Sequence, residues 1–323
     1  MSKKQRQVYF NGKMVPESEA KVSIYDSALM FGDMVFEMTR SFNGEHFKLR
    51  EHIERLYAGL KYLQIPIDMT MGEMEEACHE VTRVNDPLFA KDDEHRLMID
   101  VSRGLLGLYE SEVEGHKGTN VIIADFPLRW TVQSFAHLYS EGIETVVPSQ
   151  RTIPAELIEP KVKNRSRIQY LMANIQVSQH KGRNVWALLL DPDGFVAEGS
   201  GANIFIVKDN VLYTPEPRNI LRGISRAYVF ELAEQLDIPC IEKNFEVYDV
   251  MEADEAFFTS TPFCMVPIVK VNNMDIGTAK PGPMFDKIIT AWSENVGVDI
   301  IGQIKHFEKP VDSNAANPYE FKK

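Results

Sequence analysis

Four short strand patterns follow one another between residues 185 and 213, and this run constrains the fold more than any other feature of the sequence. They cover residues 185–190, 195–198, 203–208 and 211–213. An Asp-Pro-Asp-Gly turn separates the first two, and residues 209–210 form a hairpin turn between the last two. Short strands joined by turn residues predict a sheet-rich region with helices packed around it.

The first half of the chain mixes strand and helix patterns. Strands are predicted over residues 7–10, 34–41, 45–49, 95–103 and 120–125, the first ending at an Asn-Gly turn. Apolar residues at Ile53, Leu56 and Leu60 have helical spacing and predict a helix over residues 50–63. Thr70 with Glu73 three residues later predicts a capped helix over residues 70–82. This half therefore belongs to the α/β class with α+β character.

A chain of 323 residues corresponds to about two domains at roughly 150 residues each. Residues 127–135 have no clear period and contain Pro, Arg and Trp, which favours a linker between domains, with an ordinary surface loop as the alternative. The second half continues with predicted strands at 144–148, 256–259 and 266–271 and helices at 168–181, 225–236 and 283–295. We therefore predict a domain over 1–126, an interdomain loop over 127–137, a larger domain over 138–307 and a polar tail over 308–323.

Charge and cysteine content exclude several classes of partner. Lys and Arg number 35 against 47 Asp and Glu, a net charge of −12, which argues against nucleic acid or an anionic membrane as the main partner. Three widely spaced cysteines suggest neither a disulfide framework nor a metal site. The sequence contains no run of about 18 apolar residues, so we predict no membrane span. We expect a cytoplasmic protein that binds a small molecule.

Two segments have the composition of an anion site. In residues 221–226 (LRGISR) Gly223 precedes a predicted helix that begins with Ile224 and Ser225, and free N–H groups at a helix start favour a phosphate. The same pattern also fits an ordinary helix cap. Thr261 ends a second cluster of hydroxyl groups, which equally fits a polar turn.

Two further residues suggest a cofactor with an aldehyde and a protonated ring nitrogen. Glu198 ends a buried strand, where an unpaired carboxylate is costly, although a solvated bend is the alternative. Lys163 has three basic neighbours within four residues, and neighbouring cations lower the pKa of an amine that is to form a Schiff base. A basic run is more often a solvated face. Arg55 has the fork geometry that binds phosphate.

Together these segments resemble the fold-type IV pyridoxal-phosphate enzymes, which include branched-chain aminotransferases, D-amino-acid aminotransferases, R-selective amine transaminases and aminodeoxychorismate lyase. Seven motifs carry the resemblance in the family's order: FGDMVFE (31–37), HIERL (52–56), Lys163, EGSGANIF (198–205), LYTP (212–215), LRGISR (221–226) and ADEAFFTST (253–261). The resemblance implies a small N-terminal α/β sandwich domain and a larger C-terminal pseudo-barrel domain.

The resemblance also implies residue roles. Lys163 would hold pyridoxal 5′-phosphate (PLP) covalently and move the proton, and Glu198 would pair with the pyridine nitrogen. The phosphate would be held by Arg55, Gly223, Ile224, Ser225 and Thr261. Branched-chain enzymes carry an Asn-Tyr pair after the lysine, where this chain has Arg167 and Ile168. Tyr170 lies about 200° further round a helix, so we expect it not to replace that tyrosine directly.

Substrate residues are expected among arginines and apolar side chains near these motifs. Resemblance to D-amino-acid aminotransferases makes Arg103 the candidate for binding a carboxylate and places Arg40 in the pocket region, and Arg129 in the predicted loop would close over a ligand; we expect at most two of them to touch substrate. Phe36 and Trp130 would form the apolar wall, and Phe31 and Pro262 are the other substrate-binding candidates.

The expected activity is that of a PLP-dependent aminotransferase with a ping-pong mechanism through Lys163. The donor would be branched-chain-like, or an R-amine or D-amino acid, and a 2-oxo acid would be the acceptor. The resemblance further implies a homodimer or a larger homo-oligomer. A lyase resembling aminodeoxychorismate lyase and a catalytically silent PLP-binding paralogue are the alternatives.

Overall fold

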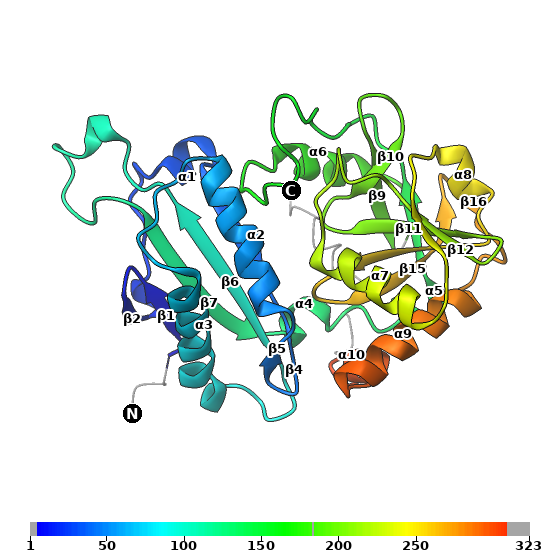
Figure 1. Cartoon of the computed structure of the whole chain (residues 1–323), viewed down its shortest axis with the longest axis horizontal. Coiled ribbons are helices and arrows are strands. Elements are labelled where there is room, and N and C mark those ends of the chain that lie inside the picture. Colours follow the sequence, from blue (N-terminus) through cyan, green and yellow to red (C-terminus); the bar gives the residue numbers. More distant parts are fainter. Residues whose placement is uncertain (1–4, 183, 309–323) are drawn as a thin grey trace. The chain divides into compact units, whose positions relative to one another are not determined.

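The computed structural model describes residues 5–182 and 184–308, which divide into two compact units (Figure 1). The first unit comprises the described residues up to Trp130 together with Val162–Arg167. The second comprises Thr131–Lys161 and the described residues from Ile168 onward. The chain leaves the first unit at Trp130, inside the stretch 127–137 that we predict as an interdomain loop. A short helix, α4 (Arg129–Val132), lies in that stretch.

A five-stranded antiparallel sheet forms the first unit, in the order β2-β1-β7-β6-β3. Its strands are β1 (Gln7–Phe10), β2 (Lys13–Pro16), β3 (Met34–Met38), β6 (His95–Ser102) and β7 (Asn120–Pro127). Figure 1 shows helices α2 (Leu49–Tyr62) and α3 (Met71–Asn85) covering one face of this sheet. The short elements are η1 (Glu17–Glu19), α1 (Ser27–Phe31), β4 (Ser41–Phe42), β5 (Glu45–His46), η2 (Asp86–Leu88) and η3 (Gly107–Tyr109).

The two helices form because their apolar residues line one side. Ile53, Leu56 and Leu60 of α2 are fully buried in the core of the unit, as their spacing predicts. The capping box that opens α3 is also confirmed: the Thr70 hydroxyl accepts from the Glu73 N–H, and the Glu73 carboxylate accepts from the Thr70 N–H.

The strand predicted over residues 45–49 is wrong beyond its second residue. β5 ends at His46, and α2 already begins at Leu49. Lys48 has a left-handed backbone with φ of 53°, so the chain turns there instead of continuing as a strand. The sequence analysis also missed β2 and α1, which contain four and five residues and are too short to show a clear period.

A nine-stranded sheet forms the second unit. β10 pairs with both β9 and β11, so six strands close into a ring in the order β10-β9-β8-β15-β14-β11. This closure is the predicted pseudo-barrel. The strands are β8 (Ile143–Val146), β9 (Val185–Leu190), β10 (Val196–Gly199), β11 (Asn203–Lys208), β12 (Val211–Thr214), β13 (Cys240–Glu242), β14 (Glu255–Ser260), β15 (Cys264–Val271) and β16 (Met274–Asp275).

Six helices of the described chain belong wholly to the second unit: α5 (Leu138–Glu141), α6 (Ile168–Val177), α7 (Ile224–Gln235), α8 (Val247–Met251), α9 (Pro283–Val296) and α10 (Ile300–His306). α7 and α9 pack against each other and against β14. The predicted helix over 168–181 ends four residues early, at Val177. No helix in the described part of the chain is both long and apolar enough to cross a membrane. Except for Glu308, the predicted tail lies outside the described residues.

The segment Val162–Arg167 differs from the predicted domain bounds, because it belongs to the first unit although it lies inside 138–307. Its backbone joins the edge of β3: the Phe36 N–H donates to the Lys163 carbonyl, and the Arg165 N–H donates to the Met34 carbonyl, both at 2.9 Å. Val162 is buried in the core of the first unit. The segment therefore acts as a short extra strand of the first sheet.

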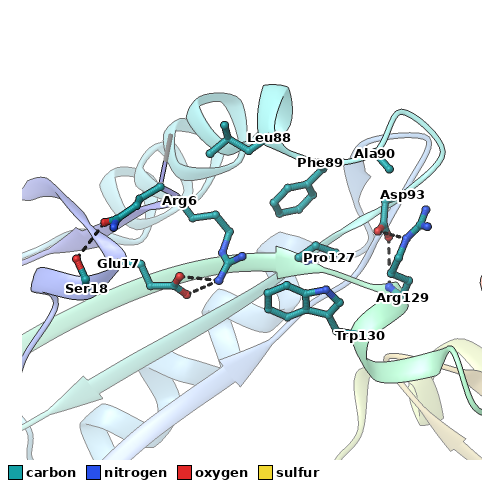
Figure 2. Close-up of a pocket in the computed structure, with 11 residues that line it drawn as sticks. Arg6, Glu17, Ser18, Leu88, Phe89, Ala90, Asp93, Pro127, Arg129 and Trp130 are labelled. Carbon is teal, nitrogen blue, oxygen red and sulfur yellow. Dashed lines mark hydrogen bonds and ion pairs between the residues drawn. The ribbon is translucent and has the colours of Figure 1, made fainter. Parts of the chain in front are cut away.

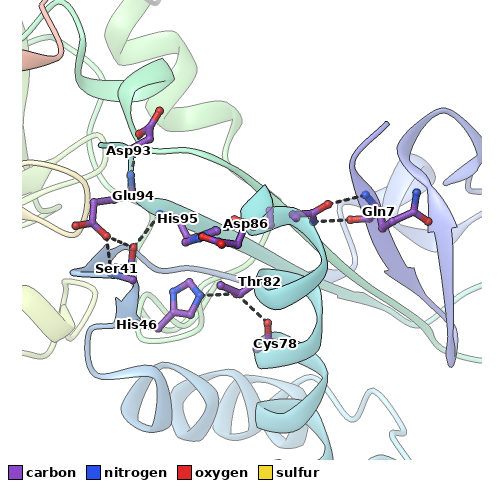
Figure 3. Close-up of polar contacts among 12 residues, drawn as sticks. Gln7, Ser41, His46, Cys78, Thr82, Asp86, Asp93, Glu94 and His95 are labelled. Atoms are coloured by element: carbon purple, nitrogen blue, oxygen red, sulfur yellow. Dashed lines mark hydrogen bonds and ion pairs between the residues drawn. The ribbon is translucent and has the colours of Figure 1, made fainter. Parts of the chain in front are cut away.

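A buried polar cluster joins the start of β6 to its neighbours (Figure 3). His95 Nδ1 lies 2.8 Å from Oδ2 of Asp125 on β7, and His95 Nε2 lies 3.3 Å from Oδ1 of Asp86 at the start of η2. The His95 N–H donates to the Ser41 hydroxyl, which itself donates to Glu94. These contacts connect β4, β6, β7 and η2 through side chains as well as through the sheet.

Candidate functional site

Lys163 is the centre of the candidate site in the first unit. Its ammonium lies 4.5 Å from the ring centroid of Phe36, a buried residue of β3. Desolvation lowers the pKa of Lys163 to about 7; Glu37 opposes this shift, and the nearby cations Arg167, Arg55 and Arg165 reinforce it. At neutral pH a large share of this amine is therefore unprotonated and nucleophilic, as the sequence predicts for a lysine that forms a Schiff base.

Beside Lys163 lies a buried ion-pair network formed by Glu37, His52 and Arg55. The Arg55 guanidinium donates to both oxygens of Glu37, from Nε at 2.6 Å and from Nη2 at 2.8 Å. His52 Nδ1 lies 2.8 Å from Oε2 of Glu37. Burial alone raises the pKa of Glu37, but Arg55 and His52 outweigh it and hold the pKa well below its usual range. Glu37 is therefore a fixed negative charge that orients Arg55.

The α2 helix places these groups by its periodicity. His52 and Arg55 are three residues apart and so lie on the same side of the helix, toward β3. Burial lowers the pKa of His52, and the charges of Arg55 and Lys163 lower it further. Glu37 raises this pKa but does not outweigh them. A neutral His52 donates from Nδ1 to Glu37, which leaves its buried Nε2 without a hydrogen-bond partner among the described residues.

Glu198 is the centre of the candidate site in the second unit. It lies on β10 and is 4% exposed. The Tyr170 hydroxyl donates to Oε1 at 2.7 Å, while the Leu221 N–H and the Asn203 amide donate to Oε2 at 3.1 and 3.3 Å. These three donors are uncharged, so they stabilise the carboxylate without neutralising it. Tyr170 thus supports Glu198, a role that the sequence analysis did not foresee.

The start of α7 carries the predicted phosphate-binding residues. Gly223 caps the helix without a side-chain hydrogen bond, and Ile224 and Ser225 are its first two residues. Their N–H groups have no intrahelical acceptor, as in the first turn of any α-helix. A Cβ atom at Gly223 would lie 2.2 Å from Oδ1 of Asn203, which explains why glycine occupies this position.

Thr261 and Pro262 lie in the turn between β14 and β15. The turn is held by Thr259, whose hydroxyl donates to the Cys264 carbonyl at 2.7 Å, and Cys264 itself has φ of 60°. Thr261 is half-buried and Pro262 is buried. Both follow the end of β14, which pairs with β11, the strand that carries Asn203.

The three arginines predicted near the substrate have structural partners in the first unit. Arg103 donates to Asp33 and to the carbonyls of Leu63 and Gln64. Arg40 is 1% exposed, with its guanidinium 3.9 Å from the Phe42 ring. Arg129 pairs with Asp93 and Asp92. None of the contacts named here is with Lys163, and the contact of these arginines with substrate stays a prediction.

Of the predicted substrate-binding residues in the first unit, Phe36 lies against Lys163, and the Phe31 carbonyl accepts from the Ser166 hydroxyl in the same segment. Phe31 is 67% exposed at the end of α1. Trp130 lines a separate pocket of about 660 Å³, where the Arg6 guanidinium lies 4.5 Å from its ring (Figure 2). Figure 2 also shows Arg6 paired with Glu17, and Arg129 with Asp93, in this pocket.

Sequence reasoning missed four groups close to Lys163: Glu37, His52, Asp100 and Arg165. Glu37 and His52 stand inside two of the motifs that carry the resemblance, so a signal was present. Arg165 was considered only as a positive charge near the lysine. Asp100 gave no signal, because its closeness to Arg165 depends on the pairing of β6 with β3.

Comparison with known proteins identifies a family and several relatives to which this chain is similar. The family model described as "Amino-transferase class IV" matches residues 34–271. A putative branched-chain-amino-acid aminotransferase of Methanocaldococcus jannaschii is 37% identical, with coverage of 90% of this chain and 98% of that protein. The branched-chain-amino-acid aminotransferase of Escherichia coli is 31% identical (90% and 93%), and a D-alanine aminotransferase of Bacillus licheniformis is 27% identical (90% and 96%).

Solved structures give the same result. The crystal structure of the Escherichia coli branched-chain amino acid aminotransferase has a TM-score of 0.80 and 27% identity, covering 96% of this chain and 98% of that one. The T.th. branched-chain amino acid aminotransferase complexed with N-(5′-phosphopyridoxyl)-L-glutamate has a TM-score of 0.78 and 27% identity, covering 91% and 95%.

Proposed function

Since this chain belongs to the class IV aminotransferases and is a transaminase with the fold-type IV architecture, we propose that it uses PLP bound covalently to Lys163. The observation that carries the proposal is the placement of the Lys163 amine over the Phe36 ring beside the cations Arg55 and Arg165, where its pKa is lowered to about 7 and the amine is reactive at neutral pH. The solved structure of a relative in complex with a phosphopyridoxyl compound supports the choice of cofactor.

The residues present fit the chemical groups of PLP. An aldehyde requires an unprotonated amine, which Lys163 supplies. The resemblance implies a phosphate held by oriented N–H donors and a cation: the start of α7 in the second unit has such donors, and Arg55 in the first unit is such a cation. A protonated pyridine nitrogen requires a buried carboxylate, and Glu198 accepts only uncharged donors in its three hydrogen bonds described above. When bound, PLP supplies the electron sink that makes the donor's Cα–H bond acidic.

In this proposal the protein's own groups divide the work as the resemblance implies. Lys163 moves the proton that leaves Cα, because its lowered pKa lets it both accept and return a proton near pH 7. Glu198 pairs with the ring nitrogen and keeps it protonated. The phosphate is held by Arg55, Gly223, Ile224, Ser225 and Thr261.

The donor is branched-chain-like or D-amino-acid-like, the two classes named among the relatives. Spectral conversion of the bound cofactor to its amine form by panels of L-amino acids, D-amino acids and amines tests this proposal. We expect conversion by at least one amino acid and reversal by a 2-oxo acid, with neither in the Lys163→Ala variant. Conversion at the wild-type rate in that variant would refute the role of Lys163.

We also propose that the enzyme is a homodimer or a larger homo-oligomer. The supporting observation is an apolar surface on the first unit formed by Ile24, Leu29, Phe31 and Leu108, which are between 63% and 73% exposed. The α1 and η3 segments that carry it are adjacent, since the rings of Tyr25 and Tyr109 lie 5.0 Å apart. Exposed apolar surfaces of this kind mark protein interfaces.

A further inference from the structure

We propose that Arg165 binds the carboxylate of the amino donor and that Asp100 is the residue that positions it; this rests on the role of Lys163 proposed above. The guanidinium carbon of Arg165 lies over the Phe36 ring, 3.7 Å from its centroid. Its Nε and Nη2 both donate to Oδ1 of Asp100, at 2.9 and 2.7 Å. The Arg165 side chain is therefore held by the Phe36 ring and by the Asp100 carboxylate.

The backbone of the first unit explains this arrangement. Asn164 bridges Val35 in an antiparallel pair, so Lys163 and Arg165 flank that pair and project to the same side of the segment. Phe36 pairs directly with Asp100 across β3 and β6. Arg165 thus reaches across the width of β3 to Asp100, with Phe36 beneath it.

The position suits an α-carboxylate because Arg165 and the reactive amine of Lys163 contact the same ring, that of Phe36, and the charge of Arg165 acts on Lys163. The ammonium of Lys163 and the guanidinium carbon of Arg165 both lie within 4.5 Å of the Phe36 ring centroid. In an α-amino acid only one carbon separates the amino nitrogen from the carboxylate carbon. A carboxylate receptor for a donor that reacts at Lys163 must therefore lie within a few ångströms of that lysine.

Arg165 retains the capacity to bind a second carboxylate. Its side chain is 32% exposed, and its Nη1 has no hydrogen-bond partner in the described part of the chain. Both of its bonds to Asp100 use a single carboxylate oxygen, Oδ1. A guanidinium has five N–H donors, so a substrate carboxylate can be bound while the contact with Asp100 persists.

The variant Arg165→Gln is expected to fold, because Asp100 does not then remain as an isolated buried charge. Burial raises the pKa of Asp100, and Arg165 opposes that shift. Without Arg165 the carboxyl group takes up a proton more readily. Arg50→Gln is a matched control, since Arg50 lies on the exposed face of α2 and pairs with Glu54.

The test compares PLP-loaded wild type, Arg165→Gln, Arg165→Lys and Arg50→Gln in two measurements. With the best amino acid donor, we expect Arg165→Gln to raise KM about 10- to 100-fold, the loss of one charge-assisted contact, while kcat changes less than about threefold. Arg165→Lys restores part of the loss, and Arg50→Gln changes neither constant. In calorimetric titration, Arg165→Gln weakens binding of 4-methylpentanoate at least about tenfold and leaves the neutral 4-methylpentanamide unaffected.

Unchanged binding of 4-methylpentanoate by Arg165→Gln would overturn the proposal, as would a fall in kcat at constant KM, which would indicate that Arg165 acts only on Lys163. Failure of the proposed role of Lys163 would give a different result. In that case the Lys163→Ala variant converts the cofactor at the wild-type rate.

Discussion

At the scale of single residues, Glu37 is the group whose charge the candidate site depends on most. Glu37→Gln removes the buried carboxylate that accepts hydrogen bonds from Nε and Nη2 of Arg55 and replaces a charged pair by a neutral amide. We expect the free energy of unfolding to fall by roughly 3 kcal/mol, as when one partner of a buried ion pair is removed. Because Glu37 raises the pKa of Lys163, the same variant should lower that pKa below about 7.

Urea unfolding and the pH dependence of PLP reattachment measure the two effects. Glu17→Gln serves as control, because its ion pair with Arg6 is exposed and should contribute less than about 1 kcal/mol. An equal loss of stability in both variants would contradict the buried network.

Local sequence predicted the chemical identity of several site residues but not their partners. Lys163, Glu198 and Arg55 stood out because a lysine among cations, a carboxylate ending a strand and an arginine on a helix each have a recognisable chemical use. The partners Asp100 and Tyr170 lie 65 and 28 residues from the groups they contact. Such contacts depend on strand register and helix placement, which no local pattern specifies.

At the scale of elements, His95 joins β6 to β7 and to the end of α3. Burial lowers the pKa of His95, but hydrogen bonds and charges from Asp125 and Asp86 outweigh this effect and raise the pKa above 6.5. A raised pKa stabilises the fold below about pH 6.5, and that contribution is lost as pH rises through the pKa of the folded state.

His95→Gln should therefore lose more stability relative to wild type at pH 5.5 than at pH 8.5. Denaturant unfolding at the two pH values measures the difference. His79→Gln, on the exposed side of α3, is the control for the loss of an imidazole at the surface. A loss that is equal at both pH values would show that His95 contributes packing alone.

The sequence predicted the long elements better than the short ones. Periodicity located α2, α3 and β9 within a few residues because a buried face repeats several times along each. β5 and α1 contain two and five residues, too few for a period, and their ends depend on left-handed residues such as Lys48 and Gly32. The attachment of Val162–Arg167 to β3 had no local signal at all.

At the scale of the whole molecule, the apolar surface on α1 and η3 is the candidate interface between copies of this chain. If a second copy covers it, Leu29→Glu together with Leu108→Glu should shift the protein toward the monomer, because two charges would be buried at the interface. Light scattering after size exclusion measures the mass. Ile241→Glu, an exposed apolar residue of the second unit, is the control. A double variant with the wild-type mass would show that this surface is not the interface.

The covalent attachment of PLP to Lys163 is the central claim, and it can be located directly. Borohydride reduction of the PLP-loaded protein, followed by proteolysis and mass spectrometry, identifies the lysine that carries the cofactor. The account predicts a pyridoxyl group on Lys163 and none on Lys161, whose ammonium pairs with Glu159 and donates to the Arg218 carbonyl. A label on Lys161, or no label on either lysine, would contradict it.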